Sequence, residues 1–103
     1  MRAAVSRRLR SRGWKLGDAA ELLGLSAEEA ALVELRLALS RSVRERRLKL
    51  GLSQVDLASR LGSSQSRVAK LEGADATVSI DLLIRGLLAL GASRREIGRA
   101  MAE

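Results

Sequence analysis

The chain has 103 residues, which is enough for one compact domain or for a small domain with an extension. It contains no Cys and no His, which excludes a disulfide framework, a thiolate nucleophile and the usual ligands of zinc and copper. We therefore expect no metal and no cofactor, and the missing His argues against an enzyme. With 19 Lys and Arg against 12 Asp and Glu, the net charge of +7 points first to a nucleic-acid partner.

Helix-forming residues dominate the composition. Residues that favour strands are scarce, since there are only six Val, three Ile, one Thr and one Trp. We therefore predict an all-α fold, a five-helix domain with an N-terminal helical extension. No segment approaches the ~18 consecutive apolar residues of a membrane span, and the basic N-terminus lacks the apolar stretch of a secretory signal. These features predict a cytoplasmic protein without membrane contact; an organellar transit peptide is the alternative for the acid-free N-terminus.

Charge alternates in blocks along the first half of the chain. Residues 1–15 carry a charge of +6, residues 16–34 a charge of −5, and residues 36–50 a charge of +5. The acidic block can offset one basic block within the fold and leave the other facing a partner.

We divide the chain into an N-terminal helical extension, residues 1–39, and a second domain, residues 40–103. Within the extension, a short helix is expected over residues 18–23, ending at Gly24. Trp14 is expected to anchor the extension on the core, and an exposed partner contact is the alternative.

A long apolar repeat begins after Ser26, which forms the pattern of a capping box with Glu29. No Gly or Pro follows until Gly51. One long helix over residues 27–50 is therefore expected, and two helices meeting near residues 40–42 are the alternative. The residues that repeat at helical spacing are Leu32, Leu35, Leu39, Val43, Arg47 and Leu50.

Two short helices joined by a tight turn come next. Ser53 is the expected N-cap of the first, which Gly62 ends, and Ser64 is the expected N-cap of the second, which Gly73 ends. The first helix is expected to bury one apolar face: Val55, Leu57, Ala58 and Leu61. On the second, over residues 65–72, the inward residues are Val68 and Leu71.

Two further helices complete the chain after a loop over residues 73–78. Ser79 caps a helix over residues 80–90, which Gly91 ends. Its apolar stripe consists of Ile80, Leu83, Ile84, Leu87 and Leu88. Ser93 and Glu96 form a second capping box, and the last helix runs to about residue 102.

Two short helices, a Gly-containing turn and a basic second helix form the helix-turn-helix pattern, whose second helix enters the major groove of DNA. The segment Arg46–Gly73, RRLKLGLSQVDLASRLGSSQSRVAKLEG, resembles the Cro/repressor-type helix-turn-helix family, also called XRE. The resemblance extends over residues 40–91, about half of the chain.

The resemblance implies that the following residues contact DNA: Gln54, Ser64, Gln65, Ser66, Arg67 and Lys70. Gln54 would bind a backbone phosphate and brace Gln65. Gln65 would bind an adenine edge, and Lys70 a guanine. Ser66 would contact a base or a phosphate, and Arg67 a phosphate. Arg47 and Glu72 match a structural ion pair of the family.

The implied function is a sequence-specific regulator of transcription that binds double-stranded DNA, most simply a homodimeric repressor at a palindromic operator. The alternative is an antitoxin, resembling the HigA-like antitoxins, that neutralises a partner toxin and represses its own operon. An enzyme is disfavoured, because no Ser lies in a recognisable nucleophile pattern and no His could activate one.

Overall fold

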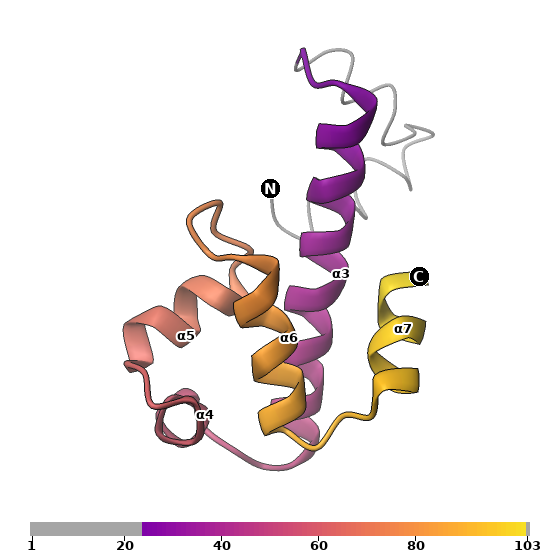
Figure 1. The fold of residues 1–103 in the computed structure, drawn as a ribbon. Helices are drawn as coiled ribbons and strands as arrows, with labels where there is room; N and C mark the ends of the chain where they lie inside the picture. The colour runs from indigo at the N-terminus through magenta and orange to yellow at the C-terminus, as the bar shows by residue number, and fades with distance from the viewer. Residues whose placement is uncertain (1–23, 103) are drawn as a thin grey trace.

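The computed structural model describes residues 24–102. This part of the chain contains helices and no strand, so the all-α prediction is confirmed (Figure 1). The helices are α3 (Ala27–Lys49), α4 (Gln54–Leu61), α5 (Gln65–Glu72), α6 (Ile80–Ala89) and α7 (Arg94–Ala102). The expected helix over residues 18–23 and the expected anchor Trp14 lie outside the described residues.

α3 is a single helix of 23 residues, so the alternative of two helices meeting near residues 40–42 is wrong. The predicted capping box at its N-terminus is confirmed. Ser26 Oγ accepts a hydrogen bond from the Glu29 amide at 3.1 Å, and Glu29 Oε1 accepts one from the Ser26 amide at 3.3 Å. Because α3 continues across residue 40, both segments of our proposed domain division share this helix; the division itself stays a prediction.

The core lies around the second half of α3. Leu39 and Val43 are fully buried there, against residues of α4, α5 and α6: Leu57, Ala58, Val68, Leu71, Leu83 and Leu87. No residue of α3 before residue 37 is buried, and Leu32 is 48% exposed. The first half of α3 extends beyond α4–α7 (Figure 1). The apolar repeat therefore predicted the helix, but not how much of it the other helices cover.

At the end of the long helix, Leu50 of the expected repeat is 51% exposed, like Leu32. In the shorter helices, two residues expected on apolar faces are exposed, and these predictions are wrong. Val55 is 62% exposed and Leu88 is 51% exposed. Val55 lies about 200° around α4 from the buried Leu57, because each residue turns an α-helix by about 100°. On α6 the buried side is instead turned toward Gly86, which faces Val43 and Leu71.

Serine N-caps and left-handed turns set the helix boundaries. Ser53, Ser64, Ser79 and Ser93 each accept a hydrogen bond from the amide three residues later, as predicted. Gly62 ends α4 in the left-handed conformation, with φ of 63°. Gly73 ends α5 but has φ of −86°, and the positive φ of this loop is that of Ala74, at 54°. Among the described helices, none is long and apolar enough to cross a membrane.

Candidate nucleic-acid interface

α4 and α5 form a helix-turn-helix in which α5 presents one face to solvent. Val68 and Leu71 are fully buried and hold α5 on the core. Because these two residues define the inner side of an eight-residue helix, the residues on its other side point outward. The exposed residues of α5 are Gln65, Ser66, Arg67, Ala69 and Lys70.

The structure brings the two predicted glutamines together. Gln65 Nε2 donates a hydrogen bond of 2.7 Å to Gln54 Oε1, so the first residue of α4 supports the first residue of α5. Gln54 Nε2, of the same side-chain amide, donates in turn to Glu72 Oε1 at 3.3 Å. Gln65 is exposed while Gln54 is half-buried, and the outer amide is therefore held by the inner one.

The Arg47–Glu72 ion pair is present and continues this network into α3. Arg47 Nε lies 2.6 Å from Glu72 Oε2, and Arg47 Nη2 lies 2.9 Å from Glu72 Oε1. Only 9% of the Arg47 side chain and 4% of the Glu72 side chain are exposed. Arg47 Nη1 also donates to the carbonyl of Leu52 at 2.7 Å. Its hydrogen bond to Glu72 raises the pKa of Arg47, so the guanidinium stays charged although it is buried.

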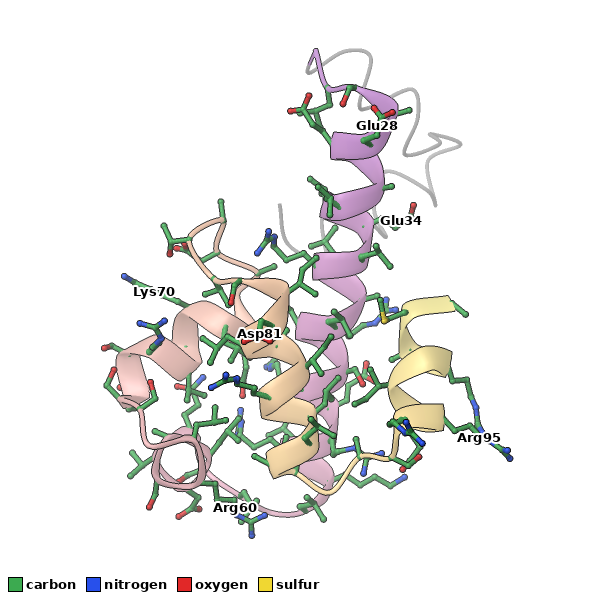
Figure 2. All side chains as sticks on the ribbon, viewed as in Figure 1. Glu28, Glu34, Arg60, Lys70, Asp81 and Arg95 are labelled. Atoms are coloured by element: carbon green, nitrogen blue, oxygen red, sulfur yellow. The ribbon has the colours of Figure 1, made fainter. Side chains whose placement is uncertain are left out.

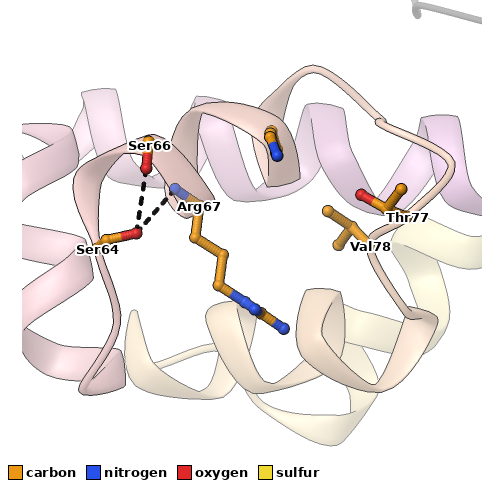
Figure 3. Close-up of a pocket in the computed structure, with 6 residues that line it drawn as sticks. Ser64, Ser66, Arg67, Thr77 and Val78 are labelled. Atoms are coloured by element: carbon orange, nitrogen blue, oxygen red, sulfur yellow. Dashed lines mark hydrogen bonds between the residues drawn. The ribbon is translucent and has the colours of Figure 1, made fainter.

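A shallow pocket of about 300 Å³ lies between α5 and the loop that follows it (Figure 3). Its lining residues are Ser64, Ser66, Arg67, Lys70, Thr77 and Val78. Ser64 Oγ lies 3.2 Å from Ser66 Oγ and accepts a hydrogen bond from the Arg67 amide. Four of the predicted DNA-contacting residues therefore surround one polar, cationic hollow. The contribution of Thr77 was not predicted from the sequence.

Asp75, which adjoins this pocket through Thr77, was not predicted from the sequence either. Asp75 Oδ1 accepts hydrogen bonds from the Thr77 amide at 2.8 Å and from the Thr77 hydroxyl at 2.6 Å. The pattern Asp-x-Thr after a helix was the available signal, because Asp readily forms such turns with the residue two positions later.

The positive charge of the described residues is not concentrated on α5. That helix carries two cations, Arg67 and Lys70, whereas α7 alone carries three exposed ones, Arg94, Arg95 and Arg99. Lys70 and Arg95 lie on opposite sides of the molecule in Figure 2. The outer face of α5 thus combines two cations, which attract phosphate, with the uncharged hydrogen-bonding residues Gln65 and Ser66.

One comparison with known proteins gives a match. A helix-turn-helix family model (HTH_3) matches residues 43–97, more than half of the chain and the whole of α4, α5 and α6. No curated protein and no solved structure matches the chain.

Proposed function

This chain belongs to the helix-turn-helix family and is a DNA-binding transcription regulator, and we propose that it is a repressor that recognises a specific sequence through α5. The observation that carries this proposal is the network from Arg47 through Glu72 and Gln54 to Gln65. It holds an exposed amide at the start of the recognition helix before DNA arrives, and base readout depends on such fixed donors and acceptors.

Each exposed polar residue of α5 has a role in this proposal. The Gln65 amide suits the N6 and N7 edge of adenine, and the Lys70 ammonium suits the O6 and N7 acceptors of guanine. Ser66 contacts a base or a phosphate. Arg67 and Ser64, at the pocket, bind backbone phosphate, as does Gln54 at the N-terminus of α4.

We further propose that the protein binds a palindromic operator as a homodimer, because family members with this motif bind half-sites one helical turn apart, ~34–36 Å. Leu88 on α6 supports this idea, since it is a large apolar residue that is half-exposed. α6 or α7 would supply the two-fold contact. A cytoplasmic location and the absence of enzymatic activity follow from the same proposal.

Fluorescence anisotropy with duplexes that tile the gene's own upstream region tests sequence recognition, with a scrambled duplex as competitor. We expect one duplex to bind far more tightly than the scramble, and Gln65→Ala and Lys70→Ala each to cost about 1–3 kcal/mol of that difference. Arg95→Ala is the matched control for charge, because Arg95 lies on α7. If the unaltered protein binds every duplex weakly and all three variants bind equally weakly, sequence-specific repression is overturned.

An antitoxin function is the second candidate, and the first half of α3 favours it. This segment exposes Leu32 and the acidic Glu28, a surface that suits a basic protein rather than DNA (Figure 2). Co-expression with a small basic neighbouring gene product, followed by co-purification, tests it. We expect Leu32→Asp to abolish co-purification while leaving operator binding unchanged. If Leu32→Asp still co-purifies with the partner, this surface is not its binding site. If the unaltered protein co-purifies with no partner, the antitoxin candidate is removed.

A further inference from the structure

A fixed carboxylate lies beside the cations of α5. The amide of Asp75 donates a hydrogen bond of 3.1 Å to the carbonyl of Lys70, so the loop folds directly back on the last turn of the recognition helix. The two hydrogen bonds from Thr77 then hold the Asp75 carboxylate in one orientation. Thr77 itself lies across the pocket from Arg67 (Figure 3). The negative charge therefore cannot swing away when DNA approaches this side of α5.

Asp75 remains ionised near neutral pH. The hydroxyl and amide of Thr77 lower the pKa of its carboxyl, and the positive charge of Lys70 lowers it further. The pocket supplies two cations to an approaching phosphate, Arg67 and Lys70, while the neighbouring loop supplies one anion. Because the potentials of neighbouring charges add, the carboxylate cancels part of the attraction that the two cations exert.

We propose that Asp75 is a specificity-determining residue that weakens the attraction of α5 to DNA phosphates and so increases the share of base contacts in binding. This inference rests on the proposed function of α5. Attraction to phosphate is independent of sequence and supplies nearly all of non-specific binding. A carboxylate that reduces it lowers the affinity for every duplex, but it lowers the affinity for the operator least. In the operator complex Lys70 contacts a base edge, whereas in other complexes it is available to pair with phosphate.

The test is Asp75→Asn in the full-length chain, with anisotropy measured on the operator and on a scrambled duplex across a salt series. Asn keeps the oxygen that accepts both hydrogen bonds from Thr77, so the substitution removes the charge and preserves the turn. We expect affinity for the scrambled duplex to rise about three- to tenfold at low salt and the operator-to-scramble ratio to fall. The salt dependence on the scrambled duplex should become steeper by up to about one phosphate contact.

Two control variants separate charge from loop shape. Thr77→Val keeps the carboxylate and its hydrogen bond from the amide of residue 77, and we expect a much smaller gain in affinity for the scrambled duplex than for Asp75→Asn. Glu28→Gln makes the same charge change at the far end of α3 (Figure 2), and we expect a much smaller gain than for Asp75→Asn. The double variant Lys70→Ala/Asp75→Asn should gain less than Asp75→Asn alone, because part of the effect acts through Lys70.

Three results would overturn the proposal: unchanged or lower affinity of Asp75→Asn for the scrambled duplex, an equal gain in Thr77→Val, or an equal gain in Glu28→Gln. Failure of the proposed function gives a different pattern. In that case the unaltered protein itself would not distinguish the operator from the scramble, whatever Asp75→Asn does to the scramble.

Discussion

Two adjacent arginines of α3 hold two different parts of the molecule in two different ways. Arg47 points toward α5 and forms a two-pronged ion pair with Glu72 in which both side chains are almost fully buried. Arg46 points toward α7 and contacts Glu96, and 26% and 45% of these side chains are exposed. The same residue type, on the same helix, thus serves a buried connection on one side and a surface connection on the other.

The difference shows which side of α3 is held in a fixed orientation. A buried pair is costly to form, but its two parallel hydrogen bonds fix the orientation of both partners. On the α5 side that precision reaches Gln65, the proposed base-contacting residue, through Gln54. On the α7 side the helix is held chiefly by its apolar face, where Ile97 and Ala100 are buried. Apolar contacts stabilise without fixing an exact orientation.

The largest expected effect comes from breaking the α5 side with Glu72→Gln. The substitution leaves the Arg47 charge buried without its carboxylate, and we expect unfolding free energy to fall by about 3 kcal/mol. The Leu52 carbonyl still accepts from Arg47, which limits the loss. Urea denaturation measures it. Operator affinity should fall as well, because only one acceptor oxygen remains at residue 72, and Gln54 and both donating nitrogens of Arg47 must share it. Asp81→Asn, which breaks the exposed Asp81–Arg85 pair of α6, is the control and should change neither quantity measurably.

On the α7 side, Ile97→Ala tests whether apolar packing holds the helix. We expect a loss of about 2 kcal/mol, because the residue is buried at the edge of the core, where α7 can partly collapse into the space. Affinity for a single half-site, per folded molecule, should stay the same, since α7 takes no part in the network that ends at Gln65. A fall in affinity comparable to that of Glu72→Gln would show that the two sides are not independent.

A smaller loss of stability is expected from a change in the turn between α4 and α5, which lies on the α5 side of the molecule. Gly62 has φ of 63°, and a Cβ placed there has no neighbour within 4 Å, so only backbone strain opposes Gly62→Ala. We expect a loss of about 1–2 kcal/mol from the left-handed conformation alone. Thermal unfolding measures it. If the loss is much larger, the turn contains a constraint besides the conformation of this residue.

Much of the fold could be predicted from the sequence because its signals are local. The N-cap serines bond the backbone amide three residues later, and Gly62 ends its helix in the left-handed conformation. Each of these signals lies within a few residues of the boundary that it specifies. The proximity of Gln54 to Gln65 came from the resemblance to a known family, since the spacing of these residues does not itself predict their contact.

The parts that could not be predicted depend on contacts between distant segments. Arg46 and Glu96 are 50 residues apart, and Arg36 donates to the carbonyl of Val78 across 42 residues. Neither pair has a signal in periodicity or capping. The exposure of Leu32 and Leu88 is similar in origin, because a helical repeat does not show where the neighbouring helices end. Val55 differs, because the turn of about 100° per residue already places it away from the buried Leu57. The Asp-x-Thr pattern indicates a turn at Asp75, but it does not show that this turn folds back onto Lys70.

The smallest expected effect comes from Glu96→Gln, and it depends on pH. Hydrogen bonds from the Ser93 amide, from Arg46 and from the Ser93 hydroxyl lower the pKa of Glu96 to about 2 from an ordinary value of 4.5. A lowered pKa in the folded state means that the charged form stabilises the fold. This contribution is complete above pH 4.5 and disappears as the pH falls from there toward 2.

The stability difference between the unaltered protein and Glu96→Gln should therefore be constant from pH 7 to about 5 and vanish near pH 2. Arg46→Met should remove only part of this pH dependence, because the hydrogen bond from the Ser93 amide remains. Denaturant unfolding across this pH range measures both variants. If Glu96→Gln costs more than Ile97→Ala at neutral pH, then the exposed pair rather than apolar packing holds α7, and the contrast between the two sides of α3 fails.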